Sequence, residues 1–276
     1  MASTNVDRCL SLVETLAARP EGAALGTLAE LVDLPKSAAH RLLQTLAARG
    51  YVTQDLETQD YRLSLRFAAL GFRYLDMHHL PDVAQGALDR LARDCGEYCR
   101  IAVIEGDGLV WIARAQGATQ GLRYEPAMDR EVVLHATATG KSWLATMPEE
   151  EALAIAYRRG FRTPPGFGPR ILTNGDDLRR HLRETRQRGY ALAIEEGEPG
   201  IVAMATTFRT FDGDDAPVAG TLSIAGPLVR LDEARTAALA PRLHDAAREI
   251  TALWPVRRRQ RAPLKPVSDT ATATTA

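Results

Sequence analysis

The stretch LPKSAAHRLLQTL, residues 34–46, decides the fold because its apolar and polar residues fall on opposite faces of one helix. The apolar face holds Ala39, Leu42, Leu43 and Leu46, at the spacing of three and four that indicates burial on one side. The other face holds Ser37, His40, Arg41 and Gln44. Pro35 suits a first helical turn, and Gly50 suits the left-handed position that ends a helix. The pattern therefore predicts a helix that runs to Gly50.

Two more helices are predicted before this stretch. Apolar residues recur at helical spacing from Val6 to Ala18, and Pro20 ends the pattern. Thr27 and Glu30 have the Ser/Thr-x-x-Glu spacing of a capping box, which predicts a short second helix with Thr27 as its cap. Residues 33–35 interrupt it. Two short helices joined by a tight turn are what a helix-turn-helix requires.

A β-hairpin is predicted directly after the third helix. Tyr51 and Val52 precede a polar segment, residues 55–60, and alternating apolar residues follow it from Tyr61 to Leu65. A hairpin in this position is typical of a winged helix-turn-helix. Taken alone, the polar stripe on the third helix is usually a solvated face. With the wing beside it, the stripe suits the major groove of DNA, where Arg pairs with guanine and Gln with adenine.

Length and composition set wider limits. A chain of 276 residues with 45% hydrophobic residues favours two domains. It has no apolar run long enough for a membrane span and no secretion signal, so we expect a cytoplasmic protein without membrane contact. Cys95 and Cys99 would lie one helical turn apart if both were helical, but no second ligand pair accompanies them, so we expect no metal and no cofactor.

Charge argues against simple electrostatic binding of DNA. The formal net charge is −1, and residues 1–64 contain six Lys or Arg against eight Asp or Glu. DNA affinity must then come from locally placed charges, and a module that only docks on other proteins stays an alternative. Basic residues gather in the tail, residues 255–276, where prolines and a Thr/Ala-rich end predict disorder.

The rest of the chain predicts an α+β domain. Helical periodicity covers 82–94, 149–159, 176–188 and 232–253, and another helix begins near Thr139. Strands are expected at 98–104, 109–115, 190–194, 201–208 and 217–225, the first two joined by a turn at 105–108. This order fits an antiparallel sheet with helices on its flanks.

Several motifs resemble the IclR family of bacterial transcription regulators. They are residues 34–46, Gly50-Tyr51-Val52, Tyr61-Arg62-Leu63, residues 135–141 (HATATGK), Gly189-Tyr190 with Glu195-Glu196 and Gly200, and residues 222–227 (LSIAGP). The resemblance covers about residues 6–254. It implies a winged helix-turn-helix (1–65), a linker helix (66–81), a GAF-like effector domain (82–254) and the tail (255–276).

By position, the resemblance implies which residues meet double-stranded operator DNA. These are Lys36, Ser37, His40, Arg41 and Gln44 on the third helix, with Thr27 and Arg62 as backbone contacts. The wing departs from the family in lacking a glycine at its tip. The resemblance also implies that the linker helix pairs two chains into a homodimer or a dimer of dimers, although an internal core contact would explain its aromatic residues equally well.

The resemblance also implies an effector pocket. Its lining is expected to be Tyr124, Val132, Ala138, Thr139, Ala193, Ile201, Ala203, Ser223 and Ala225. Where the family's small-acid sensors place Asp, Cys and Ser, this chain has Ala193, Ala203 and Ala225. A small hydrophilic acid would lose about 1 to 3 kcal/mol for each buried hydrogen bond left unmade. We therefore expect an organic acid that is larger or more apolar, such as an aromatic carboxylate.

Two local questions stay open from sequence. Thr139-Gly140 near a helix start presents amides for an anion, but ordinary capping explains the same residues. An enzyme would enlist His135, Glu195 and Glu196 for acid–base work, yet their spacing matches no catalytic motif, and adjacent residues on a strand point to opposite faces. The favoured reading is a repressor whose operator affinity a small molecule changes; an enzyme is the alternative.

Overall fold

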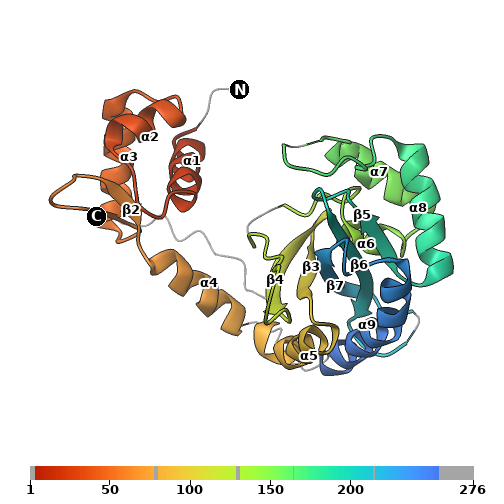
Figure 1. Cartoon of the computed structure of the whole chain (residues 1–276). Helices are drawn as coiled ribbons and strands as arrows, with labels where there is room; N and C mark the ends of the chain where they lie inside the picture. The colour runs from red at the N-terminus through yellow and green to blue at the C-terminus, as the bar shows by residue number, and fades with distance from the viewer. Residues whose placement is uncertain (1–3, 78–79, 129–130, 164, 214, 255–276) are drawn as a thin grey trace, which may run out of the picture. The chain divides into compact units, whose positions relative to one another are not determined.

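The computed structural model describes residues 4–77, 80–128, 131–163, 165–213 and 215–254 (Figure 1). The chain divides into two compact units between His78 and His79. The basic tail predicted to be disordered, 255–276, lies outside the described residues. None of the helices in the described ranges combines the length and the apolar character that a membrane span requires.

The first unit is a winged helix-turn-helix. Its elements are α1 (Asn5–Ala17), α2 (Leu25–Leu31), α3 (Lys36–Ala48), β1 (Val52–Gln54), β2 (Tyr61–Leu63) and α4 (Arg66–Met77). Strands β1 and β2 pair antiparallel, and Ala23 extends the ladder through a bridge to Tyr61. The core is a single cluster of Leu12, Leu16, Ala23, Leu28, Leu43, Leu46, Val52 and Tyr61. The periodicities that predicted the three helices thus meet in one interior.

The predicted capping box is wrong. Helix α2 is capped by Ala24, which makes no side-chain cap hydrogen bond, and Thr27 lies exposed inside the helix. Leu25 packs against the core, so its burial favours starting the helix three residues earlier than a Thr27 cap would allow. Pro35 likewise stands just before α3, where its carbonyl accepts the N–H groups of Ala38 and Ala39.

The wing closes without a glycine. Gln59 takes the left-handed conformation, with φ +62°, that glycine often supplies in such turns. Asp55 Oδ1 accepts the backbone N–H groups of Glu57 at 2.9 Å and Thr58 at 3.0 Å. These bonds organise the turn, so the missing glycine changes its residues and not its role. At the end of α3, Gly50 has φ +75°, as predicted.

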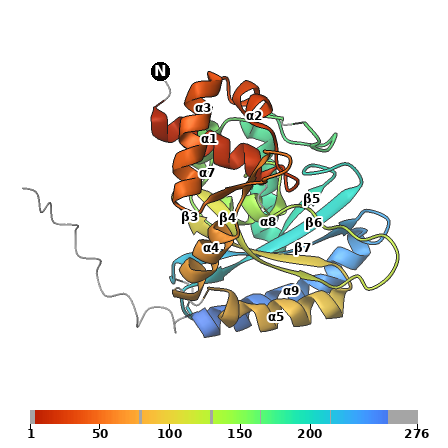
Figure 2. The same ribbon diagram turned by 90° about the vertical axis from the view of Figure 1, so that its left-hand side faces the viewer.

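The second unit is an α+β domain in three layers. It contains α5 (Leu80–Cys95), β3 (Tyr98–Glu105), β4 (Gly108–Gln116), α6 (Ala138–Leu144), α7 (Glu149–Arg159), α8 (Gly175–Arg188), β5 (Ala191–Ile194), β6 (Ile201–Arg209), β7 (Val218–Pro227) and α9 (Glu233–Leu253). The antiparallel sheet has the order β4-β3-β7-β6-β5. Helices α5 and α9 cover one face, and α6 covers the other beside α7 and α8 (Figures 1 and 2). The helix predicted over 66–81 ends at Met77, and α5 begins at Leu80 with Pro81 in its first turn.

A row of alanines lets α6 approach the sheet. The strand register places Tyr98, Ala225, Ala203 and Ala193 side by side across four strands. Ala138 of α6 packs against the alanines of this face. On its other side α6 touches the preceding loop, because a Cβ on Gly140 would lie 2.4 Å from the backbone of Leu134. Small residues therefore fix where this helix sits.

Candidate DNA-reading helix and effector cavity

Helix α3 presents one polar face outward. Lys36, Ser37, Arg41 and Gln44 are exposed and His40 is half-buried, while Ala39 and Leu43 on the opposite face have no exposed surface. Ser37, His40, Arg41 and Gln44 thus share one face, while Lys36 is the first residue of the helix and its side chain lies near Gly26 of α2. The backbone contacts predicted elsewhere lie on other elements: Thr27 on α2 and Arg62 on β2, whose Nη2 is 3.9 Å from Asp55 Oδ2 in the wing.

A cavity of about 50 Å³ lies between α6 and the alanine row of the sheet. Eight of the nine predicted effector residues line it: Tyr124, Ala138, Thr139, Ala193, Ile201, Ala203, Ser223 and Ala225. Val132 does not. It is buried in a separate core cluster with Leu134 and Trp143. The structure therefore gathers the predicted set around one space and leaves Val132 outside it.

Two lining residues that sequence reasoning missed are Arg100 and Trp111. The Arg100 guanidinium carbon lies 3.7 Å from the centroid of the Trp111 ring, a cation–π contact. In register, Arg100 of β3 stands opposite Ser223 of β7, whose hydroxyl donates to the Arg100 carbonyl at 3.4 Å. The available signal was a single arginine inside an otherwise apolar strand.

A hydrogen bond joins two residues of the cavity lining, Tyr124 and Glu198. The Tyr124 hydroxyl donates to Glu198 Oε1 at 3.2 Å, and Gln116 Nε2 donates to the Tyr124 carbonyl at 3.0 Å. The Tyr98 ring meets the Tyr124 ring edge-on, with centroids 6.0 Å apart. Glu198, also missed from sequence, belongs to the turn between β5 and β6. Tyr124 therefore contacts three other residues beside the cavity: Glu198, Gln116 and Tyr98.

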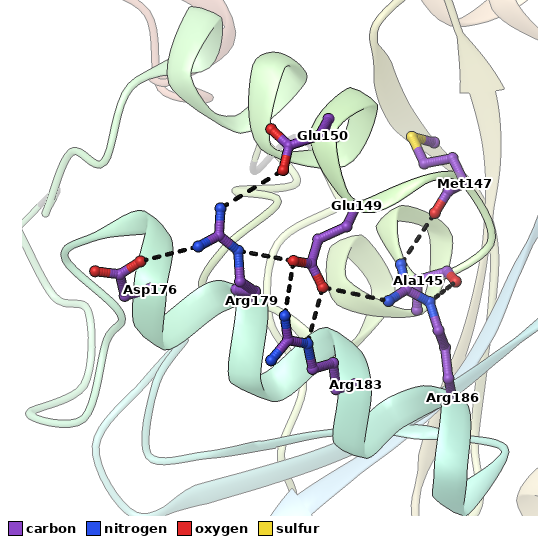
Figure 3. A network of polar contacts seen from close by, with 8 residues as sticks. All are labelled: Ala145, Met147, Glu149, Glu150, Asp176, Arg179, Arg183 and Arg186. Atoms are coloured by element: carbon purple, nitrogen blue, oxygen red, sulfur yellow. Dashed lines mark hydrogen bonds and ion pairs between the residues drawn. The ribbon is translucent and has the colours of Figure 1, made fainter.

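Ordinary capping accounts for the start of α6. Thr137 Oγ1 accepts the N–H of Gly140 at 3.0 Å, so this amide already has a partner. The other end of α6 is held by α8: Arg186 donates from Nε to the Ala145 carbonyl at 2.9 Å and from Nη2 to the Met147 carbonyl at 3.0 Å (Figure 3).

Glu149 at the start of α7 completes this network (Figure 3). Its carboxylate accepts two hydrogen bonds from Arg183, each 3.0 Å long, and forms an ion pair with Arg179 at 2.8 Å. The hydrogen bond from Arg183 lowers the pKa of Glu149. The helices around α6 are therefore tied to one another by charge-assisted bonds.

A buried ion pair lies beneath α6. Lys141 Nζ is 2.7 Å from Glu196 Oε1 and 2.6 Å from Oε2, and the two side chains are 0% and 4% exposed. His181 Nδ1 of α8 is 3.2 Å from the same Nζ. Burial, and then the charge of Lys141, lower the pKa of His181 to about 4, so the ring is neutral near pH 7.

The three residues considered for acid–base catalysis, His135, Glu195 and Glu196, each contact a different partner. His135 Nε2 lies 3.2 Å from the Arg162 carbonyl, Glu195 Oε1 accepts the N–H of Gly200 at 3.1 Å, and Glu196 binds Lys141. The two glutamates lie in the turn after β5 and not on the strand. The arrangement brings no acid–base pair together on a substrate-sized space.

The two cysteines of the second unit face each other, with Sγ atoms 3.6 Å apart in the domain interior. Among the described residues, no group of three or more His, Cys, Asp or Glu is arranged to hold a metal ion. Cys95 and Cys99 are therefore interior thiols in this structure.

Comparison with known proteins agrees with both units. The model of the IclR helix-turn-helix domain matches residues 5–56, and that of the bacterial transcriptional regulator IclR C-terminal domain matches residues 72–252. The glycerol operon regulatory protein of Streptomyces coelicolor is 30% identical over 252 residues, 89% of this chain and 92% of that protein. The acetate operon repressor of Salmonella typhimurium is 29% identical over 248 residues, 90% of this chain and 88% of that protein.

A solved structure shares the fold. The IclR homologue of Microbacterium hydrocarbonoxydans, in complex with 4-hydroxybenzoate, superposes with a TM-score of 0.73 at 22% identity and covers 92% of this chain and 100% of its own. With a family model matched over residues 72–252 and a second over the helix-turn-helix, the chain belongs to the IclR family and is a DNA-binding transcription regulator with a small-molecule effector domain, not an enzyme.

Proposed function

We propose that this regulator is a repressor that acts in the cytoplasm as a homodimer, reads operator DNA with α3, and changes its operator affinity when an organic acid occupies the cavity beneath α6. The observation that carries the proposal is the cavity itself. It brings eight residues predicted as effector contacts together with Arg100.

The DNA half of the proposal rests on the exposed face of α3. Arg41 suits guanine edges and Gln44 suits adenine, while Lys36 and Ser37 suit phosphate oxygens. Arg62 on β2 would meet the backbone beside the wing. A dimer would place two such helices on a partly palindromic operator, one helical turn of DNA or a multiple apart.

The chemistry of the cavity favours an aromatic or hydrophobic carboxylate. Arg100 supplies a cation for the carboxylate, since guanidinium pairs with it in a planar, two-bonded geometry. Trp111 and Tyr124 supply aromatic surface, and the alanine row supplies an apolar floor. At about 50 Å³ the space is smaller than the roughly 150 Å³ that holds benzene, so such an acid must open it.

Opening of the cavity would connect effector binding to DNA binding. A ligand shifts an equilibrium only by its different affinities for two states, and here the states would be a closed and an opened cavity. If the opened state sets a spacing of the two α3 helices that suits the operator less well, the acid releases repression.

The test is a gel-shift titration of the purified protein against its own upstream DNA at several salt concentrations. Benzoate, 4-hydroxybenzoate, glyoxylate and pyruvate are added separately. We expect a specific, salt-sensitive shift that one of the aromatic acids alters. In the Arg100→Met variant, the same acid should leave the shift unchanged. Tighter binding of glyoxylate or pyruvate in calorimetry would overturn the aromatic assignment.

A second outcome has its own meaning. Residues 1–64 carry more acidic than basic groups. If no upstream DNA shifts even at low salt, the winged helix of this chain acts as a docking module for another protein.

A further inference from the structure

The Lys141–Glu196 pair is a fully buried ionic contact in the second unit. All three N–H donors of the Lys141 ammonium have acceptors within reach: two oxygens of Glu196 and Nδ1 of His181. Burying two charges is expensive, and an apolar pair of similar volume is often as stable or more stable. Stability alone therefore gives no reason for an ion pair at this place.

The pair joins the two walls of the effector cavity. Lys141 stands one helical turn after Thr137 and Ala138, which line the cavity from α6. Glu196 belongs to residues 195–200, named here the rim turn, which also carry Gly197 and Glu198 of the lining. Lys141 of the ion pair thus belongs to α6, and Glu196 belongs to the rim turn.

The rim turn contains a strained backbone conformation, which the surrounding contacts must hold in place. Glu195 has φ +53°, a left-handed conformation that is unfavourable for a residue with a side chain. The backbone of the turn accepts hydrogen bonds from Gly168 N at Glu196 O and from Arg170 N at Glu195 O, both 3.0 Å. The carboxylate of Glu196 also accepts the N–H of Ile194 at 3.4 Å. Leu228 N also donates to Gly200 O at 2.7 Å, and the ion pair of Glu196 with Lys141 ties this strained turn to α6.

We propose that Lys141 is a positioning residue of the effector site: through Glu196 it fixes the rim turn, and with it the Glu198–Tyr124 contact that closes the cavity. The role assigned to the closed cavity rests on the proposed function. Because the acid must open the cavity to bind, a rim turn fixed in the closed state keeps the opened state scarce and lowers the apparent affinity for the acid.

The test is the full-length double variant Lys141→Met with Glu196→Met, which removes both charges and keeps the volume. Three quantities are compared with the unchanged protein: the thermal midpoint, hydrogen exchange of the rim-turn amides, and calorimetric affinity for benzoate and 4-hydroxybenzoate. We expect a midpoint within a few degrees, rim-turn exchange about tenfold faster, and acid affinity about tenfold tighter. A merely structural pair would not change exchange and affinity at equal stability.

Two further variants keep the result interpretable. Arg186→Met removes the tether at the far end of α6 and is the matched control, so rim-turn exchange should stay unchanged. Lys141→Met with Glu196→Gln also removes both charges but keeps an oxygen acceptor for the Ile194 N–H, so it supplies the rim-turn exchange rate if the first double variant fails to fold.

The two ideas fail in different ways. Unchanged rim-turn exchange in both Glu196 variants would overturn the positioning role of Lys141. If neither acid binds the unchanged protein, the proposed ligand class fails, while the exchange rates still decide whether Lys141 fixes the rim turn.

Discussion

Arg41 is the residue on which the DNA-reading role of α3 depends most directly. It is exposed on the polar face of the helix, so a substitution there does not disturb the core. Replacing Arg41 by Ala should cost about 1 to 3 kcal/mol of sequence-specific DNA affinity, because a two-bonded contact to guanine is lost. Gel-shift titrations with the upstream DNA and a scrambled duplex measure the difference.

Arg49→Ala is the control for this experiment. Arg49 is also exposed and lies at the C-terminal cap of the same helix, off the polar stripe. It should change affinity for both duplexes about equally, through charge alone. Equal losses for the two arginines would move the reading surface away from the stripe of α3.

His181 gives the protein a stability that depends on pH. Its pKa is about 4 in the folded protein and near 6.5 when unfolded, so the unfolded chain binds more protons between these values. Stability should therefore fall as pH drops from about 6.5 toward 4. The neighbouring groups that set this pKa are Lys141, Arg180, Arg188 and Asp177.

The check on His181 is His181→Gln, which keeps an acceptor for Lys141 but does not titrate. Denaturant unfolding at pH 7 and pH 5 should show the variant losing less stability than the unchanged protein. Because His135 is present in both proteins, its own titration cancels in the comparison. Equal losses at pH 5 would mean that His181 titrates normally in the fold.

Most of the cavity lining could be predicted from motifs, but its arginine, Arg100, could not. The alanines and Ser223 fall within recognisable stretches on β5, β6 and β7. Arg100 acquires its role only from the register that sets it opposite Ser223 and over Trp111. Val132 was predicted to line the cavity but lies in another core cluster, because its position in the sequence does not determine which cluster it joins. Pairing between strands far apart in sequence is what single-residue patterns leave out.

At the scale of elements, apolar periodicity predicted well where one face is buried. Helix α7 has the predicted bounds, Glu149–Arg159, and the strands of the second unit differ from their predicted ranges by at most two residues at either end. The capping box of Thr27 failed because a cap contributes little compared with burying Leu25. Local signals predict an element, and tertiary packing decides where it begins.

The turn between α2 and α3 contains a testable strain. Asp33 has φ +50° in this turn and is exposed. A left-handed residue with a side chain costs roughly 1 to 2 kcal/mol, least for Asp and Asn, while glycine adopts this conformation freely. Asp33→Gly should leave the first unit as stable or up to about 1 kcal/mol more stable, and Asp33→Val should destabilise it by about 1 to 2 kcal/mol.

Calorimetric unfolding of the full chain measures both changes in the transition of the first unit. Because Asp33 lies in the first unit, the transition of the second unit is the internal control and should not move. If the glycine and valine variants unfold at the same temperature, the turn relaxes without strain.

At the scale of the whole molecule, the proposed mechanism depends on assembly. Helix α4 carries exposed apolar side chains that its own unit does not cover: Leu70 is 42%, Phe72 66% and Tyr74 60% exposed. Phe67 at its start packs on the Tyr51 ring, with centroids 4.8 Å apart. This fixes α4 to the winged helix, so whatever pairs two α4 helices also pairs two reading helices.

Phe72→Glu tests this dependence, because a charge in an apolar contact between two chains would have to be desolvated without a partner. We expect mostly monomer by light scattering on a sizing column, and a loss of operator affinity larger than for Arg41→Ala, since both half-sites are then bound independently. The matched control is Leu122→Glu, at an equally exposed apolar residue of the second unit, which should stay dimeric. A Phe72→Glu variant that still dimerises and binds the operator normally would place the pairing surface elsewhere and separate it from the linker helix.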